Sequence, residues 1–260
     1  MNFIKKSALE QKKIIRDNLN KLFIIHYSCE TFIDNEKRIT PRISAICVRK
    51  FSEGITESFS IHLEAEIKGL DKDNIEEQYD DLEKNMLAKY YGFLIKHKNT
   101  YFIHWNMRDG NYGFQAIDQR YSMLGESPMV VEESRRIDLA QLLANLYGPD
   151  YIEHPRMEKL IDHNKITKKD FLSGKKEAEE FDNKNYLSLH RSTLRKVDAI
   201  GEVLKLFLVN KLKTRTNKSQ QLIESIYEHV IFRFISMVCV IGSFMAIIYG
   251  LIVFLRQRIQ

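Results

Sequence analysis

Acidic side chains near apolar segments are the first residues whose types and spacing could support catalysis. Glu30 lies near the end of one apolar stretch, Asp109 follows a second, and Asp198 lies in a long amphipathic stretch. Carboxylates that meet in the folded chain can hold divalent cations such as Mg²⁺, which activate water for phosphodiester hydrolysis. Whether these three carboxylates meet depends on the fold. The alternative is that they are ordinary polar residues at the ends of strands and helices.

Aromatic and basic residues near these carboxylates have the side chains needed to hold a nucleic acid strand. Aromatic rings can stack on bases, and arginine or asparagine can contact phosphates. The residues that we expect to contact nucleic acid are Glu30, His104, Trp105, Arg108, Asp109, Asn111, Tyr112, His190, Arg195 and Asp198. For Trp105, the single tryptophan, packing in the core is the competing interpretation.

The overall charge agrees with an anionic partner but does not select one. The chain has 40 Lys and Arg residues against 35 Asp and Glu residues, and its pI is near 8.9. Five lysines gather between residues 165 and 176, where they could meet phosphates or lipid headgroups. The cysteines, Cys29, Cys47 and Cys239, are odd in number and lack metal-ligand spacing, so free thiols in a reducing compartment are expected.

These residues need an α/β framework, and the hydrophobic pattern predicts one. Three successive stretches have the composition of strands, then helical spacing begins at residue 71, and a further strand and several helices follow. We expect a mixed sheet flanked by helices. The predicted strands are 22–32, 42–51, 57–64 and 100–105, and the predicted helices are 75–93, 114–121, 137–147, one opening at Pro155, and 186–212. His26, His62 and His104 alternate with apolar residues, which predicts partly buried histidines on strands with satisfied hydrogen bonds.

The last apolar stretch, Phe234 to Leu255, has the length and composition of a membrane span. It carries no charge and is bounded by Arg233 and Arg256. At about 1.5 Å per residue its roughly 22 residues reach about 33 Å, enough for a bilayer core. We therefore predict a domain at 1–212, a linker helix at 213–233 and one transmembrane helix at 234–255. The N-terminus lacks the apolar core of a secretory signal, so the soluble part is expected to stay inside the cell.

Small residues recur along the predicted span at helical spacing. Gly242, Ala246 and Gly250 form a repeated small-xxx-small pattern, which favours close packing between membrane helices. A single helix cannot enclose water, so a pore would need several copies. Its candidate lining residues are Ser236, Ser243 and Tyr249.

The order of the predicted strands and acidic motifs resembles the DEDD family of 3′ to 5′ exonucleases. That resemblance implies an RNase H-like sheet. Ser28-Cys29-Glu30-Thr31 stands where the family has D-x-E-T, and His104 with Asp109 resembles its second motif. Asp198 suits the last motif, but Thr193 and Leu194 occupy the offsets where the family has His or Tyr. The metal ligands that the resemblance implies are Glu30, Asp109 and Asp198. With Ser28 in place of a carboxylate and no base at those offsets, we expect no enzymatic activity, with Mg²⁺ as the only cofactor that the residual acidic site suggests.

A nuclease-like domain joined to one self-associating span is similar to the channel proteins of the Hailong anti-phage defence system. The resemblance implies a homotetrameric channel in the bacterial inner membrane with its soluble domain in the cytoplasm. It also implies a single-stranded DNA oligomer, made by a partner nucleotidyltransferase, that holds the channel closed. The alternatives are a membrane-anchored 3′ to 5′ exonuclease, in which His190 or a lysine supplies the missing base, and a tethered adaptor without a nucleic acid ligand.

Overall fold

A mixed five-stranded sheet forms the centre of the protein in the computed structural model, which describes residues 3–30, 40–108, 110–216 and 237. The strand order is β3-β2-β1-β4-β5. β1 pairs antiparallel with β2 and parallel with β4, β2 pairs antiparallel with β3, and β4 pairs parallel with β5. The strands are β1 (Leu22–Cys29), β2 (Ile43–Lys50), β3 (Thr56–Ser60), β4 (Tyr101–His104) and β5 (Arg136–Asp138). The predicted α/β class with a mixed sheet is confirmed.

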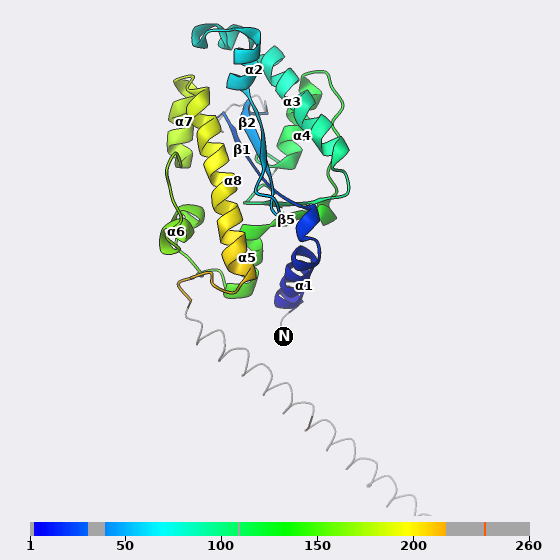
Figure 1. The fold of residues 1–260 in the computed structure, drawn as a ribbon, viewed down its shortest axis with the longest axis vertical. Coiled ribbons are helices and arrows are strands. Elements are labelled where there is room, and N and C mark those ends of the chain that lie inside the picture. The colour runs from blue at the N-terminus through cyan, green and yellow to red at the C-terminus, as the bar shows by residue number, and fades with distance from the viewer. Residues whose placement is uncertain (1–2, 31–39, 109, 217–236, 238–260) are drawn as a thin grey trace, which may run out of the picture.

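Both faces of the sheet are covered by helices, as Figure 1 shows. Side chains of successive residues point to opposite faces of a strand, so Phe23, Ile25 and Tyr27 of β1 enter one core while Leu22 and Ile24 enter the other. Burial on both sides explains why β1 is a nearly continuous apolar run rather than an alternating one.

The first core lies under α3 (Tyr79–Lys96) and α4 (Phe114–Met123). Aromatic rings fill much of it: Phe23 meets Phe93 edge to face with ring centroids 5.2 Å apart. The second core lies under α8 (Tyr186–Leu208), α5 (Leu139–Tyr147) and α1 (Phe3–Asp17). The remaining helices are α2 (Ile61–Lys68), α6 (Arg156–His163) and α7 (Gly174–Asp182), with short 3₁₀ turns at Leu19–Lys21, Lys72–Asn74, Glu76–Gln78 and Glu133–Arg135.

Several predicted boundaries were wrong because local capping overrides the hydrophobic pattern. The third strand ends at Ser60, whose hydroxyl accepts a hydrogen bond from the Leu63 N–H, so His62 lies in α2 rather than on a strand. The predicted helix at 137–147 begins instead at Leu139, because the Asp138 carboxylate caps it by accepting from the Ala140 and Gln141 N–H groups.

α8 ends at Leu208, four residues earlier than the predicted helix end at 212. Residues 213–216 are not helical, so the predicted linker helix does not begin at 213. They lie against the domain instead, where the Arg215 N–H donates to the Tyr151 carbonyl at 2.7 Å. Among the residues that the structure describes, no helix is long and apolar enough to cross a bilayer, and apart from Met237 the predicted span and its pore-lining residues lie outside them.

Candidate functional site

The main candidate site is a cavity at the carboxyl ends of β1 and β4. Its volume is about 510 Å³. One wall comes from the sheet, including His26, Ser28 and Trp105, and the opposite wall comes from the segment 155–178 at the start of α6 and α7. The edge at which parallel strands end is a common place for ligands in α/β proteins. Of the residues predicted to bind nucleic acid, Glu30, Trp105 and Tyr112 line this cavity.

A cluster of hydroxyl groups lies beside the cavity at the end of β1. The Ser28 Oγ lies 2.8 Å from the Ser44 Oγ. The Thr193 Oγ1 on α8 lies 3.0 Å from the same Ser28 oxygen, so the three hydroxyls form one hydrogen-bonded cluster. All three residues are buried. Thr193 also donates to the Leu189 carbonyl at 2.8 Å, which makes it the donor of an ordinary backbone contact in α8. The α8 residue that faces Ser28 is thus a threonine, not an acid.

A buried ion pair forms part of the opposite wall. Lys196 of α8 lies with its Nζ 2.6 Å from a carboxylate oxygen of Glu177 in α7, and the Ser192 hydroxyl donates to the other Glu177 oxygen at 2.7 Å. The Lys196 ammonium also lies 5.3 Å from the centre of the Phe171 ring. The pair therefore joins α7 to α8 at the cavity and neutralises the Glu177 charge.

His26 lies deep in the cavity lining and has an unusual environment. Its side chain is 5 % exposed, and its Nδ1 has no hydrogen-bond partner among the described residues. Burial, followed by the nearby Lys196 and His104, holds the pKa of His26 well below its ordinary value, so the ring is neutral at pH 7. The prediction of a partly buried, satisfied histidine was therefore wrong for His26.

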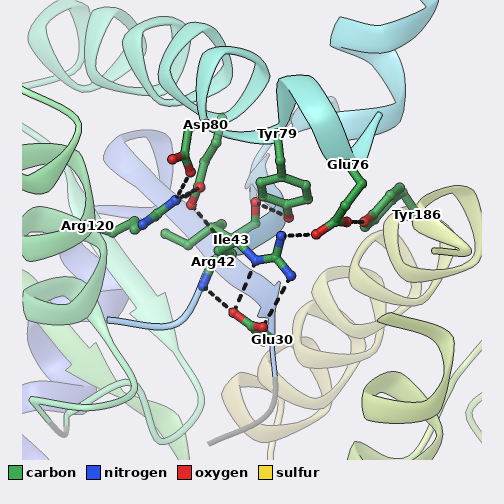
Figure 2. Close-up of polar contacts among 9 residues, drawn as sticks. Glu30, Arg42, Ile43, Glu76, Tyr79, Asp80, Arg120 and Tyr186 are labelled. Atoms are coloured by element: carbon green, nitrogen blue, oxygen red, sulfur yellow. Dashed lines mark hydrogen bonds and ion pairs between the residues drawn. The ribbon is translucent and has the colours of Figure 1, made fainter. Parts of the chain in front are cut away.

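Glu30, at the rim of the cavity, is bound to a cation of the protein itself. Both of its carboxylate oxygens lie 3.2 Å from the Arg42 guanidinium, as Figure 2 shows. Arg42 also pairs with Glu76, and its guanidinium lies 4.6 Å from the centre of the Tyr79 ring. Each carboxylate oxygen of Glu30 is therefore already paired with the Arg42 guanidinium.

Asp198 lies at the other end of the sheet from Glu30. Its carboxylate pairs with Arg49 of β2 at 2.9 Å, and Arg49 lies opposite Ile24 in the strand register. Arg42 and Arg49 are seven residues apart, which at about 3.3 Å per residue separates their Cα atoms by roughly 23 Å. The structure does not bring Glu30 and Asp198 together.

The described carboxylates therefore do not fit a two-ion centre. Ions that act together in phosphodiester hydrolysis lie about 4 Å apart and share ligands, which Glu30 and Asp198 cannot provide. Throughout the described ranges, no group of three His, Cys, Asp or Glu side chains is arranged to hold a metal ion. Asp109, the third predicted ligand, lies outside the described residues.

Two other predicted residues line a separate cavity of about 440 Å³ near the ends of β4 and β5. Arg108 pairs there with Asp138 at 2.6 Å and donates to the Gln141 side chain at 2.7 Å. The His104 Nδ1 accepts from the Met107 N–H, and burial lowers the pKa of His104 to about 4 against a smaller opposing effect of Asp138.

The remaining predicted residues lie around these cavities without lining either. His190 packs against His62 of α2 with ring centroids 4.8 Å apart, and burial followed by His62 and Arg191 lowers its pKa to about 4. The Arg195 side chain donates to the Lys169 carbonyl at 2.8 Å, and Asn111 is exposed in the turn before Tyr112.

The cavity residues that were missed from the sequence include His26, Lys196 and Glu177. Only Lys196 carried a usable indication, because it lies one helical turn after the Thr193 position already compared with the exonuclease motif. Comparison with protein-family models, with curated proteins and with solved structures finds no match to this chain.

Proposed function

We propose that this protein is a membrane effector whose domain binds a single-stranded DNA oligomer and does not cut it. The bound strand holds closed a channel built by the C-terminal segments of several copies, four in the arrangement that the Hailong resemblance implies. The setting is anti-phage defence at the bacterial inner membrane, with the domain in the cytoplasm and a partner nucleotidyltransferase supplying the oligomer.

The observation that carries this proposal is the Ser28 and Thr193 contact beside a large cavity. In the exonuclease resemblance, the first position of the D-x-E-T motif and a residue of the last helix are acidic. In this chain the first position is Ser28, and the residue of α8 that faces it is Thr193 rather than Asp198. Here the facing pair consists of two hydroxyls 3.0 Å apart, which are poor ligands for a pair of Mg²⁺ ions compared with carboxylates. The strand order β3-β2-β1-β4-β5, with an antiparallel β2, supports the RNase H-like interpretation of the sheet.

The lysine cluster noted in the sequence supports a phosphate backbone at the same place. Lys169 lies two residues from Phe171 of the cavity wall, and Lys175 and Lys176 lie directly before Glu177. All three lysines are exposed. Phosphate contacts of this kind give sequence-independent, salt-sensitive affinity.

α8 offers a physical connection between the cavity and the tail. It carries Thr193 and Lys196 at the cavity and ends at Leu208, from which the chain runs on toward the apolar stretch. A ligand that contacts Lys196 can shift a closed and open equilibrium if it binds the two states with different affinity.

The first test measures binding and cutting together. Purified full chain in detergent is mixed with end-labelled single-stranded DNA and Mg²⁺ or Mn²⁺, and both retention and strand length are followed. We expect retention without shortening, weakened at least tenfold in a Lys169→Glu, Lys175→Glu, Lys176→Glu variant. The matched control reverses three lysines of α1, Lys5, Lys6 and Lys13, which lie toward the opposite end of the domain (Figure 1).

Each result decides between the candidate functions. Progressive shortening of the strand would support the exonuclease alternative, and absence of retention would support the adaptor. The channel is tested separately by dye leakage from liposomes that contain the full chain. Leakage that is the same with and without oligomer would contradict the proposed gating.

A further inference from the structure

The charges around the 510 Å³ cavity argue against a phosphate as the group that enters it. Its lining includes the carboxylates of Glu30, Glu158 and Glu177 but one ammonium, that of Lys196. Glu177 already neutralises this ammonium at 2.6 Å. An anion that entered would lose water without gaining a free cation, so the occupant of the interior should be uncharged.

The apolar and aromatic side chains that line the cavity suit an aromatic group. Trp105, Tyr112 and Phe171 contribute rings to its lining, and Met157 and Leu172 add apolar surface. Tyr112 is held in place because it stacks on Tyr27 with centroids 4.6 Å apart, and its hydroxyl donates to the Tyr27 carbonyl. The volume lies within the range of about 300–1,000 Å³ that is usual for small-ligand sites.

His26 supplies the polar group that such a ligand would need. An unpartnered polar atom in a buried side chain normally destabilises the folded state, so a structure that keeps one usually pairs it with a ligand or a water molecule. Neutral imidazole presents one N–H donor and one acceptor nitrogen. The edge of every nucleobase carries hydrogen-bonding groups that can pair with one or both of these.

We propose that the cavity binds a single nucleobase, with the base edge hydrogen-bonded to His26 and the base faces packed against the aromatic lining. The inference rests on the proposed binding of single-stranded DNA and adds to it a base-recognition pocket. The sugar and phosphates of that nucleotide then lie outside, toward Lys169, Lys175 and Lys176. His26 is the residue that should make affinity depend on the presence and identity of one base.

The base could come from the strand or from a free nucleotide, and the experiment separates these sources. Binding to the full chain in detergent is measured with labelled oligodeoxynucleotides of one length in which a single position, from the 5′ to the 3′ end, lacks its base. Parallel titrations use the four free deoxynucleosides. We expect one abasic position to weaken strand binding about tenfold, and a smaller effect elsewhere.

Variants of His26 test the assigned contact. His26→Phe should reduce the difference between the complete strand and the critical abasic strand from about tenfold to about threefold or less. His26→Gln keeps a donor and an acceptor and should retain part of the difference, and it serves if the phenylalanine variant unfolds. The control, Tyr151→Phe, removes another buried unpartnered polar atom that does not line the cavity, and it should leave the difference unchanged.

The outcomes distinguish this inference from the function on which it rests. Equal affinity for the complete strand and for every abasic strand would overturn the nucleobase pocket while leaving strand binding intact, and would assign His26 to a bound water. Failure of all strands to bind would overturn the proposed function. Deoxynucleoside binding that depends on His26 in that case would keep the pocket and assign it to a free nucleotide.

Discussion

At the scale of single residues, the hydroxyl network of Ser28, Ser44 and Thr193 replaces charge with neutral hydrogen bonds. Ser28 is 2 % exposed and Thr193 is fully buried, so acidic side chains facing each other there would need metal ions or protons to be stable. Hydroxyls need neither. The network lets the end of β1 and α8 approach closely at Thr193.

Removing either partner of this contact should therefore destabilise the fold. Ser28→Ala and Thr193→Val should each lower the free energy of unfolding by about 1–2 kcal/mol, because each leaves a buried hydroxyl with fewer partners. The double variant should cost less than the sum, by about 1 kcal/mol, since both ends of one contact are gone. Denaturant unfolding of the four proteins measures this, and strictly additive effects would contradict a direct interaction.

Glu83 and Arg120 form a second buried contact, on the opposite face of the sheet from His26. Glu83 is fully buried and lies 2.6 Å from one Arg120 nitrogen and 2.9 Å from another, and it accepts from the Ile43 N–H at 2.7 Å. Asp80 also pairs with Arg120, as Figure 2 shows. Burial raises the pKa of Glu83, and the contacts with Arg120 and Ile43 oppose that effect.

At the scale of elements, this pair ties α3 to α4 and to the start of β2. Glu83→Leu should lower the free energy of unfolding by about 3–5 kcal/mol, because the buried Arg120 charge loses its buried partner and keeps the exposed Asp80. The double change Glu83→Leu, Arg120→Met should recover most of that loss, since both charges leave the interior together. Urea unfolding of the single and the double variant measures these free energies. A double variant as unstable as the single one would show that the charges themselves hold these elements together.

The turn between β4 and α4 depends on a glycine. Gly113 has φ +153°, and a Cβ there would come within 2.5 Å of the Met107 carbonyl oxygen. Its N–H donates to the Tyr27 hydroxyl at 2.9 Å, which fixes the turn to β1 beside Tyr112. Gly113 therefore fixes the position of its neighbour Tyr112 at the cavity.

Gly113→Ala should therefore reduce both stability and ligand binding. The added methyl must displace backbone, so we expect a loss of about 2 kcal/mol or more in the free energy of unfolding and weaker binding of the oligomer. The control is Gly92→Ala in α3, where a Cβ meets no atom within 4 Å. It should stabilise the helix by up to about 1 kcal/mol. Equal behaviour of the two variants in unfolding and binding assays would refute this account of the turn.

The strands were predictable to different degrees for physical reasons. β1, β2 and β4 are apolar on both faces, and their predicted and observed ranges differ by three residues or fewer at each end. The third strand was extended too far because Ile61 and Leu63 continue the alternation, although the same residues also suit the first turn of α2. Only the hydrogen bond to Ser60 distinguishes the two cases.

The site was predictable where its residues are close in sequence to a strand end. Glu30, Trp105 and Tyr112 were found in this way. Asp198 was assigned to the site from its offset, but five residues along a helix turn the side chain by about 140° from Thr193, which is the residue that meets Ser28. Lys196 was indicated by its place one helical turn after Thr193. Glu177 comes from a helix that packs on β1 only in the folded chain, so no local pattern could place it.

At the scale of the whole molecule, the folded chain keeps several histidines neutral in its interior. Burial is the first cause that lowers the pKa of His104 and of His190 to about 4 each, and it also lowers that of His26. Charged groups then act on each ring: Asp138, Arg108 and Arg136 on His104, and Arg191 and His62 on His190. These histidines come from β1, β4 and α8, so their protonation would disturb the centre of the domain.

Stability should consequently fall as the solution becomes acidic. Between the ordinary pKa of 6.5 and the folded value of about 4 for His104, the unfolded chain binds a proton that the folded chain does not. The contribution of neutral His104 to the free energy of unfolding is therefore fully present above about pH 6.5 and is lost as the pH falls toward 4. The whole loss is roughly 3 kcal/mol.

A His104→Asn variant isolates this contribution. The asparagine oxygen can accept from the Met107 N–H as the His104 Nδ1 does, but it does not titrate. Urea unfolding between pH 7.5 and pH 4.5 should show a loss of stability smaller than that of the unmodified chain by about 2 kcal/mol. The exposed His163→Asn serves as control and should leave the pH dependence nearly unchanged. If His104→Asn follows the unmodified chain across this range, acid sensitivity must come from carboxylates and not from a buried neutral imidazole.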